Sequence, residues 1–131
     1  MNGSAVTVLN CIDGRTQMPV INWLKENFCV DYVDSITQAG MDKVLSQGNW
    51  IEIEILKKNV LVSVTDHHSK LVAIVGHYDC AANPVSEFQH FKDIIASINV
   101  VKTWGLPVNI VGLWVDEFWS VHVVEKEVAI A

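Results

Sequence analysis

The chain has 131 residues, of which 50% are hydrophobic, so it can bury one core but is too short for two ordinary domains. Fifteen acidic residues against nine Lys and Arg give a formal net charge of −6, which argues against a nucleic-acid partner. No apolar run approaches the roughly 20 residues that cross a bilayer. The first apolar run is not preceded by the positive charge that is typical of a signal peptide. We therefore expect one soluble domain over residues 1–131, without a membrane partner.

The first part of the chain predicts a strand, a helix and a second strand. Residues 6–9 form a β-branched run that ends shortly before Cys11, which is typical of a buried parallel strand followed by a loop. Pro19 is a good first helical residue, and the spacing of the apolar residues after it predicts an amphipathic helix over residues 19–28. Residues 29–33 then predict a second strand.

The segment of residues 50–69 is ambiguous. Two runs of alternating apolar residues, 51–55 and 60–64, favour by themselves a hairpin of two strands. A connection between parallel strands must cross a face of the sheet, however, and such crossovers usually contain a helix. We therefore expect a helix in this segment.

The second half of the chain gives the clearest elements. Residues 71–76 are an apolar run that predicts a buried strand and delivers His77 directly beyond its end. Residues 86–104 carry apolar side chains at helical spacing, with a serine suited to the N-cap at the start. Residues 108–115 predict another buried strand, and residues 120–125 a strand that pairs with it. Together these elements indicate a small α/β domain with a parallel sheet.

Three cysteines in a chain without an export signal argue against a disulfide framework and for thiols kept reduced in a cytoplasm. Cys29 lies in an apolar stretch with no partner pattern, so we expect it in the core. Cys11 and Cys80 lie instead beside other polar side chains. Reduced thiols at those positions are available as metal ligands or nucleophiles.

Two short loops follow predicted buried strands. Residues 11–15 read Cys-Ile-Asp-Gly-Arg, and residues 76–80 read Gly-His-Tyr-Asp-Cys. Both lie at the carboxyl edge of the sheet, where open α/β sheets bind ligands near a switch in strand order. If the two strands are neighbours, Cys11, His77 and Cys80 converge, and two thiolates with one imidazole suit zinc.

Three protein ligands leave one position of a zinc tetrahedron free, which is typical of a catalytic site. Water bound there can be acidified to hydroxide near neutral pH. Asp13 is close enough in sequence to Cys11 to hydrogen-bond that water, while Arg15 holds the carboxylate in place. Alternatively, Asp13 swings onto the zinc as a fourth ligand and closes the site, and the sequence leaves both arrangements open.

The other histidines and aromatic residues are interpreted as structural or surface residues. We expect no catalytic role for Tyr78 or Asp79, which fill the spacer between two ligands. Phe118 and Trp119 are expected to pack or to cover a subunit contact. The remaining histidines are placed on the surface or in structural positions: His67, His68, His90 and His122.

Residues 11–15 have the pattern Cys-x-Asp-x-Arg, and residues 76–80, about sixty residues later, have the pattern Gly-His-x-x-Cys. In this pair of motifs the chain resembles the β-class carbonic anhydrases. The likeness extends through the later helix and the last two strands, so the chain looks like a small, divergent member. The resemblance implies a three-layer α/β fold with a central, mainly parallel sheet. It also implies a zinc-dependent carbonate dehydratase that hydrates CO2 to bicarbonate by a zinc-bound hydroxide.

The resemblance further implies roles for residues that match the family's motifs. Cys11, His77 and Cys80 are the expected zinc ligands, and Asp13 and Arg15 the expected dyad beside the metal water. The family usually assembles as a homodimer or a higher homo-oligomer, which is therefore the expected partner state.

The sequence departs from the family's pattern in three places. The chain begins directly at the first strand, without the long N-terminal helices that embrace the partner subunit in the family. The family's Arg-Asn-Ala-Gly stretch appears here as Thr-Gln-Ala-Gly over residues 37–40, and Ala81 stands where a glycine usually follows the second zinc cysteine. These differences affect the subunit contact and the substrate pocket.

The residues leave other functions open. One is a related zinc hydrolase of another small electrophile, such as carbon disulfide. Another is a catalytically silent zinc domain in which Asp13 closes the coordination sphere. A metal-free protein with Cys11 as a covalent nucleophile would leave the His-x-x-Cys pair without an explanation.

Overall fold

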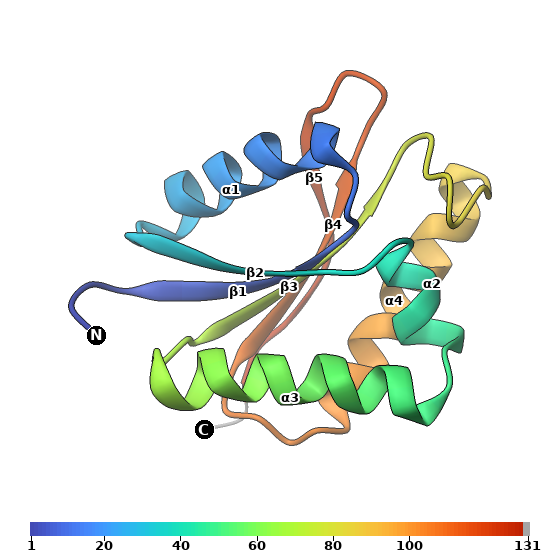
Figure 1. Cartoon of the computed structure of the whole chain (residues 1–131). Coiled ribbons are helices and arrows are strands. Elements are labelled where there is room, and N and C mark those ends of the chain that lie inside the picture. The colour runs from blue at the N-terminus through green and yellow to red at the C-terminus, as the bar shows by residue number, and fades with distance from the viewer. Residues whose placement is uncertain (130–131) are drawn as a thin grey trace.

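The computed structural model describes residues 1–129, which contain one five-stranded sheet and four helices (Figure 1). The strands are β1 (Ala5–Asn10), β2 (Tyr32–Thr37), β3 (Leu71–His77), β4 (Asn109–Val115) and β5 (Val121–Glu127). The helices are α1 (Gly14–Phe28), α2 (Met41–Gln47), α3 (Trp50–Asp66) and α4 (Glu87–Lys102). The sheet has the order β2-β1-β3-β4-β5, and its pairs are parallel except for the antiparallel β4 and β5. The predicted α/β architecture is confirmed.

Helices cover both faces of the sheet, which gives three layers (Figure 1). On one face, Val20 and Leu24 of α1 pack against β1, β3 and β4. On the other face, α2, α3 and α4 contribute Met41, Leu56 and Ile94 to a second and larger core cluster. None of the helices in residues 1–129 is both long and apolar enough to cross a membrane.

The burial of β1 and β3 explains why their sequences predicted strands. Every residue of β1 and of β3 is buried, because helices cover the sheet on both faces. Strands in that position consist of nearly continuous apolar runs. The edge strand β2 is only partly buried, and its sequence carries a weaker signal.

The second strand and Cys29 differ from the prediction. Cys29 is exposed and ends α1 in a left-handed conformation (φ 52°), where its N–H donates to the Lys25 carbonyl at 3.0 Å. The strand begins only at Tyr32. The prediction that Cys29 lies in the core was wrong, because a short apolar stretch can also form the surface end of a helix.

The helix boundaries also differ in part. Helix α1 begins at Gly14 rather than at Pro19, because Asp13 caps it by accepting a hydrogen bond from the Arg15 N–H. Residues 50–66 form α3, as the crossover argument predicted, and the shorter α2 was missed because its seven residues are too few for a periodic pattern. The Ser86 cap of α4 and the pairing of the last two strands are confirmed.

Candidate metal centre

The topology brings the two predicted loops together. β1 and β3 are neighbours, and the connections that leave them run to opposite sides of the sheet, to β2 and to β4. This is a switch in strand order, where open α/β sheets place their ligands. Cys11 follows β1 directly, and His77 is the last residue of β3.

Cys11, His77 and Cys80 form a compact cluster. Their ligand atoms all lie within 4.8 Å of one another, and all three residues are buried. Within residues 1–129, this is the one group of three or more His, Cys, Asp or Glu side chains that lie close enough together to hold a metal ion. Two sulfurs and one imidazole nitrogen are donors that zinc prefers.

The hydrogen bonds of His77 leave one ring nitrogen free for a ligand. Its Nδ1 lies 2.7 Å from the Tyr78 carbonyl oxygen, which can only accept, so Nδ1 carries the proton. Nε2 is buried and has no hydrogen-bond partner in the described part of the chain. Such an orphaned nitrogen is costly unless something binds it, and the Nδ1 contact is the usual support of a metal-binding histidine. The cluster therefore fits a metal ion.

The two thiols share one negative charge. The hydrogen bond from Cys80 lowers the pKa of Cys11 and raises the pKa of Cys80, and the Gly40 N–H adds a contact to Cys11 Sγ at 3.5 Å. Burial is the largest single influence on His77 and acts to lower its pKa, but the contacts with Cys11 and the Tyr78 carbonyl and the charge of Asp13 together raise it. A cation bound here can replace the proton that the two thiols share.

Gly40 belongs to the stretch that departs from the family's pattern. Its φ of +62° suits glycine, and a Cβ there would lie 3.1 Å from the backbone of Ala82. The absence of a side chain lets the loop after β2 close on the loop that carries Cys80. The sequence marked Gly40 only as part of a changed motif, whereas the structure places its N–H on a candidate ligand.

Asp13 and Arg15 form a pair at the edge of the cluster. The Arg15 guanidinium donates to both Asp13 oxygens, with the shortest contact at 2.7 Å from Nη2 to Oδ2. These bonds lower the pKa of Asp13 to about 2. Asp13 Oδ2 lies 3.9 Å from His77 Nε2, so the carboxylate faces the orphaned nitrogen from just beyond hydrogen-bond distance.

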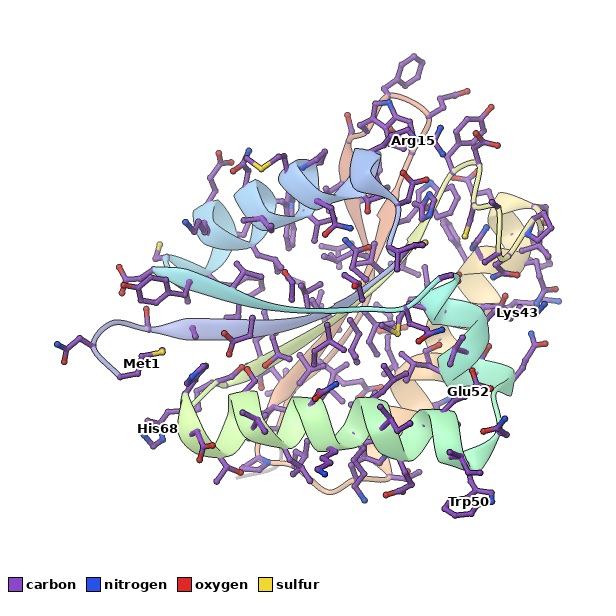
Figure 2. The ribbon with its side chains drawn as sticks, viewed as in Figure 1. Met1, Arg15, Lys43, Trp50, Glu52 and His68 are labelled. Carbon is purple, nitrogen blue, oxygen red and sulfur yellow. The ribbon has the colours of Figure 1, made fainter. Side chains whose placement is uncertain are left out.

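Two further residues hold Arg15: Asp79, for which the sequence predicted no catalytic role, and Trp119, for which it predicted packing or a subunit contact. Asp79 accepts from Arg15 through Oδ2 and through its carbonyl oxygen, both at 3.1 Å. The Trp119 ring lies under the guanidinium, with 4.7 Å from Cζ to the ring centroid. Figure 2 shows Arg15 at the start of α1, beside the turn between β4 and β5.

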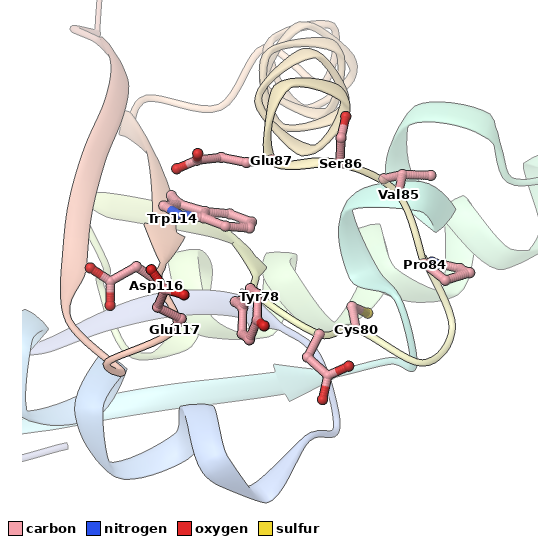
Figure 3. Close-up of a pocket in the computed structure, with 10 residues that line it drawn as sticks. Tyr78, Cys80, Pro84, Val85, Ser86, Glu87, Trp114, Asp116 and Glu117 are labelled. Carbon is pink, nitrogen blue, oxygen red and sulfur yellow. The ribbon is translucent and has the colours of Figure 1, made fainter.

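A cavity of about 500 Å³ adjoins the cluster at Cys80. Figure 3 shows Tyr78 and Trp114 on its walls near Cys80, with Glu87 at the start of α4. Trp114 Nε1 is the other buried side-chain atom of the described residues without a hydrogen-bond partner. The cavity gives small molecules a path toward the ligand loop.

A second buried polar cluster consists of Asp42, Asn83, His90 and Asp93, and we call it the Asp42 cluster. Through Asn83 it stabilises the loop that carries Cys80. The Asn83 side chain donates to Asp42 at 3.1 Å and to Asp93 at 3.0 Å. His90 Nδ1 lies 2.6 Å from Asp42 Oδ2, which agrees with its structural interpretation. Because Asn83 follows Cys80 closely, these bonds anchor the loop to α2 and α4.

The chain is similar to known proteins both in sequence, through a family model, and in fold, through solved structures. A family model described as "Putative carbonic anhydrase" matches residues 1–125. A β-carbonic anhydrase isoform I from Trichomonas vaginalis shares the fold with a TM-score of 0.61 and 16% identity, over 91% of this chain and 81% of that chain. No curated protein sequence matches.

Two more solved structures give the same picture. A carbonic anhydrase from Glaciozyma antarctica has a TM-score of 0.62 and 13% identity, over 92% of this chain and 81% of that chain. One of two tetrameric β-carbonic anhydrases from Sordaria macrospora has a TM-score of 0.60 and 12% identity, over 95% and 84%. At these identities the likeness establishes a shared fold.

Proposed function

The chain belongs to the carbonic anhydrase family whose model covers residues 1–125, and on that premise we propose that it is a zinc-dependent carbonate dehydratase that hydrates carbon dioxide to bicarbonate. The observation that carries the proposal is the buried His77 Nε2, which has no hydrogen-bond partner within residues 1–129 and lies beside two thiols. Cys11, His77 and Cys80 would hold the ion. Zinc bound by three residues acidifies a water near neutral pH and so supplies the nucleophile for carbon dioxide.

Asp13 is the proposed catalytic residue, and Arg15 holds it. With its pKa lowered to about 2 by Arg15, Asp13 is ionised at neutral pH and can only accept hydrogen bonds. Its Oδ2 lies 3.9 Å from His77 Nε2. Asp13 would therefore accept a hydrogen bond from the attacking water and fix its orientation.

The cavity beside Cys80 supports an uncharged substrate. Aromatic rings of Tyr78 and Trp114 line it, together with the carboxylates of Glu87 and Glu117. Carbon dioxide carries no charge and is not repelled by these carboxylates. Bicarbonate is an anion, so the same carboxylates favour its departure.

The test is stopped-flow hydration of carbon dioxide at roughly pH 7 and pH 9, on protein whose zinc content is measured in the same sample. We expect one zinc per chain and activity that rises with pH. The Asp13→Asn variant should keep its zinc and lose roughly 100-fold or more in kcat, since positioned proton-transfer groups contribute about that much. Wild-type protein with one zinc per chain and no hydration at either pH would overturn the proposed reaction, and activity on carbon disulfide alone would select another electrophile.

A second candidate is a catalytically silent zinc domain, which the proximity of Asp13 to the cluster favours. With 3.9 Å between Asp13 Oδ2 and His77 Nε2, a small side-chain movement would let the carboxylate act as a fourth ligand. The four contacts between Arg15 and Asp13 oppose that movement. Absorption spectra of the cobalt-substituted protein that show four protein ligands and no exchangeable water would select the silent domain.

We also propose that residues 1–131 act as a single zinc-binding domain that assembles as a homodimer or higher homo-oligomer. Exposed apolar side chains follow two candidate ligands at Ile12 and Tyr78, and another lies at Phe118 in the turn between β4 and β5. The enzymes from Sordaria macrospora are tetrameric. A cytoplasmic location fits ligand cysteines that must stay reduced. Light scattering on a sizing column tests the assembly, and a monomer at all concentrations would contradict it.

A further inference from the structure

Two residues that hold Arg15 have left-handed backbone conformations. Asp79 has a φ of 56° and Trp119 a φ of 61°, and they are two of the four non-glycine residues with positive φ among residues 1–129. Aspartate tolerates this conformation, but for a bulky aromatic residue it is an outlier. Outliers of this kind persist where the surrounding structure uses them.

The turn between β4 and β5 does not itself require tryptophan. The Asp116 carboxylate accepts from the Phe118 N–H and the Ser120 N–H at 2.9 Å each, and the Trp119 N–H donates to the Asp116 carbonyl at 3.0 Å. These contacts use backbone groups at residues 118–120, and glycine would adopt the backbone of residue 119 without strain. The tryptophan side chain packs partly against the core cluster beneath α1, and it adds an aromatic ring under Arg15 that glycine would not provide.

Asp79 approaches the same guanidinium from the opposite loop. It lies between two candidate ligands, His77 and Cys80, and its contacts tie their loop to the loop of Asp13 through Arg15. The Arg15 side chain is 45% exposed and that of Asp79 is 68% exposed. Ion pairs this exposed contribute little to stability, so their geometric effect on Arg15 is the more important one.

We propose that Asp79 and Trp119 are positioning residues, a clamp that fixes Arg15 and through it holds Asp13 beside the metal-ligand cluster. The inference rests on the proposed function for its kinetic consequence, but not for its structural one. Without the ring and the second carboxylate, Arg15 keeps its bonds to Asp13 but is free to rotate with it. The orientation of Asp13 toward His77 Nε2 is then no longer fixed.

The experiment uses a property of the sequence: Arg15 is the only arginine in the chain. Its side-chain Nε–H therefore gives a single, unambiguous signal in a ¹⁵N-correlated NMR spectrum of the zinc-loaded protein. The matched variants are Trp119→Phe, which keeps an aromatic face, and Trp119→Leu, which removes it at the same backbone strain. Hydrogen exchange of the Arg15 Nε–H, kcat/KM, zinc content and Tm are measured for both.

We expect Trp119→Phe to resemble the wild type in every measurement. Trp119→Leu should exchange the Arg15 Nε–H roughly tenfold faster and lose roughly tenfold in kcat/KM, as small misplacements of a catalytic group do. Its zinc content should stay at one per chain. Equal exchange rates and equal kcat/KM in the Leu and Phe variants would overturn the clamp.

Asp79→Asn gives an independent test if Trp119→Leu fails to fold, because asparagine tolerates the left-handed backbone and removes only the charge. Faster Arg15 exchange than in the control Glu26→Gln, at the far end of α1, is the expected result. Unchanged exchange in Asp79→Asn would contradict its part in the clamp. If the wild type does not hydrate carbon dioxide, the proposed function fails, while Arg15 exchange still decides whether the clamp exists.

Discussion

Two buried histidines of this protein have opposite surroundings. His77 and His90 are each only 1% exposed, so burial does not distinguish them. His90 belongs to the Asp42 cluster, and within residues 1–129 the buried side-chain atoms of that cluster all have hydrogen-bond partners. His77 Nε2 has none in the same part of the chain. An unsatisfied atom, rather than a buried polar residue as such, therefore marks where a ligand belongs.

The largest expected effect is the loss of metal when a candidate ligand is removed. Cys80→Ser should lower zinc affinity by more than the roughly 100-fold typical of losing a mere supporting residue. Zinc content after dialysis against a chelator measures this. The control is Cys29→Ser, an exposed cysteine distant from the cluster, which should retain one zinc per chain. Stoichiometric zinc in Cys80→Ser would refute the ligand assignment.

The Asp42 cluster should respond in stability instead of metal content. Asp42→Ala removes the buried partner of His90 Nδ1 and one of the two acceptors of the Asn83 amide, which should cost about 3 kcal/mol in the free energy of unfolding. Urea denaturation measures the loss, with the exposed Asp66→Ala as the control. Folded Asp42→Ala should still hold one zinc per chain, and a variant that is fully stable but free of zinc would erase the contrast between the two histidines.

A smaller effect is expected in the first half of β1, away from Cys11, where the buried Thr7 hydroxyl has hydrogen-bond partners. The Thr7 hydroxyl lies 2.6 Å from the Ser63 hydroxyl and 2.8 Å from that of Ser69, and all three residues are buried. Thr7→Val keeps the shape and removes these bonds, which should cost roughly 1–2 kcal/mol. The exposed Thr65→Val is the matched control. A change in zinc affinity in Thr7→Val would mean that this hydrogen-bonded group is coupled to the metal-ligand cluster.

The sequence predicted the elements that lie in the middle of the sheet and the residues at their ends. Buried parallel strands consist of apolar runs, so β1 and β3 were found, and with them the positions of Cys11 and His77. The edge strand β2 and the exposed Cys29 were misplaced, because a partly buried strand and the surface end of a helix share similar short patterns. Local patterns carry little information there.

The partners of Arg15 were out of reach for a different reason. Asp79 and Trp119 meet Arg15 only when two separate loops come together at the start of α1, and no spacing in the sequence predicts those contacts. A tryptophan at the turn position where glycine would be unstrained is the one local signal that could have drawn attention to Trp119. The bonds of Asp42 depend likewise on the packing of α2 against α4.

The smallest expected effect lies in the turn that carries Trp119, where the partly buried Asp116 contrasts with the fully buried Asp42. The contact with His122, at 2.6 Å between Nε2 and Oδ2, lowers the pKa of Asp116 below its ordinary value of 3.8. A carboxyl with a lowered pKa stabilises the folded turn above its ordinary pKa, and that contribution is lost as the pH falls through the lowered value. The turn should therefore be unaffected by acid until below about pH 4 and then loosen.

The indole N–H signal of Trp119, followed by NMR from roughly pH 6 down to pH 2, reports this loosening. Asp116→Asn keeps a carbonyl oxygen that can accept from the Phe118 and Ser120 N–H groups, but it cannot titrate. Any release of metal in acid affects both proteins, so the difference between their curves isolates Asp116. The wild-type signal should move below about pH 4 while that of Asp116→Asn stays flat by comparison, and identical curves would show that the turn is held by its backbone alone.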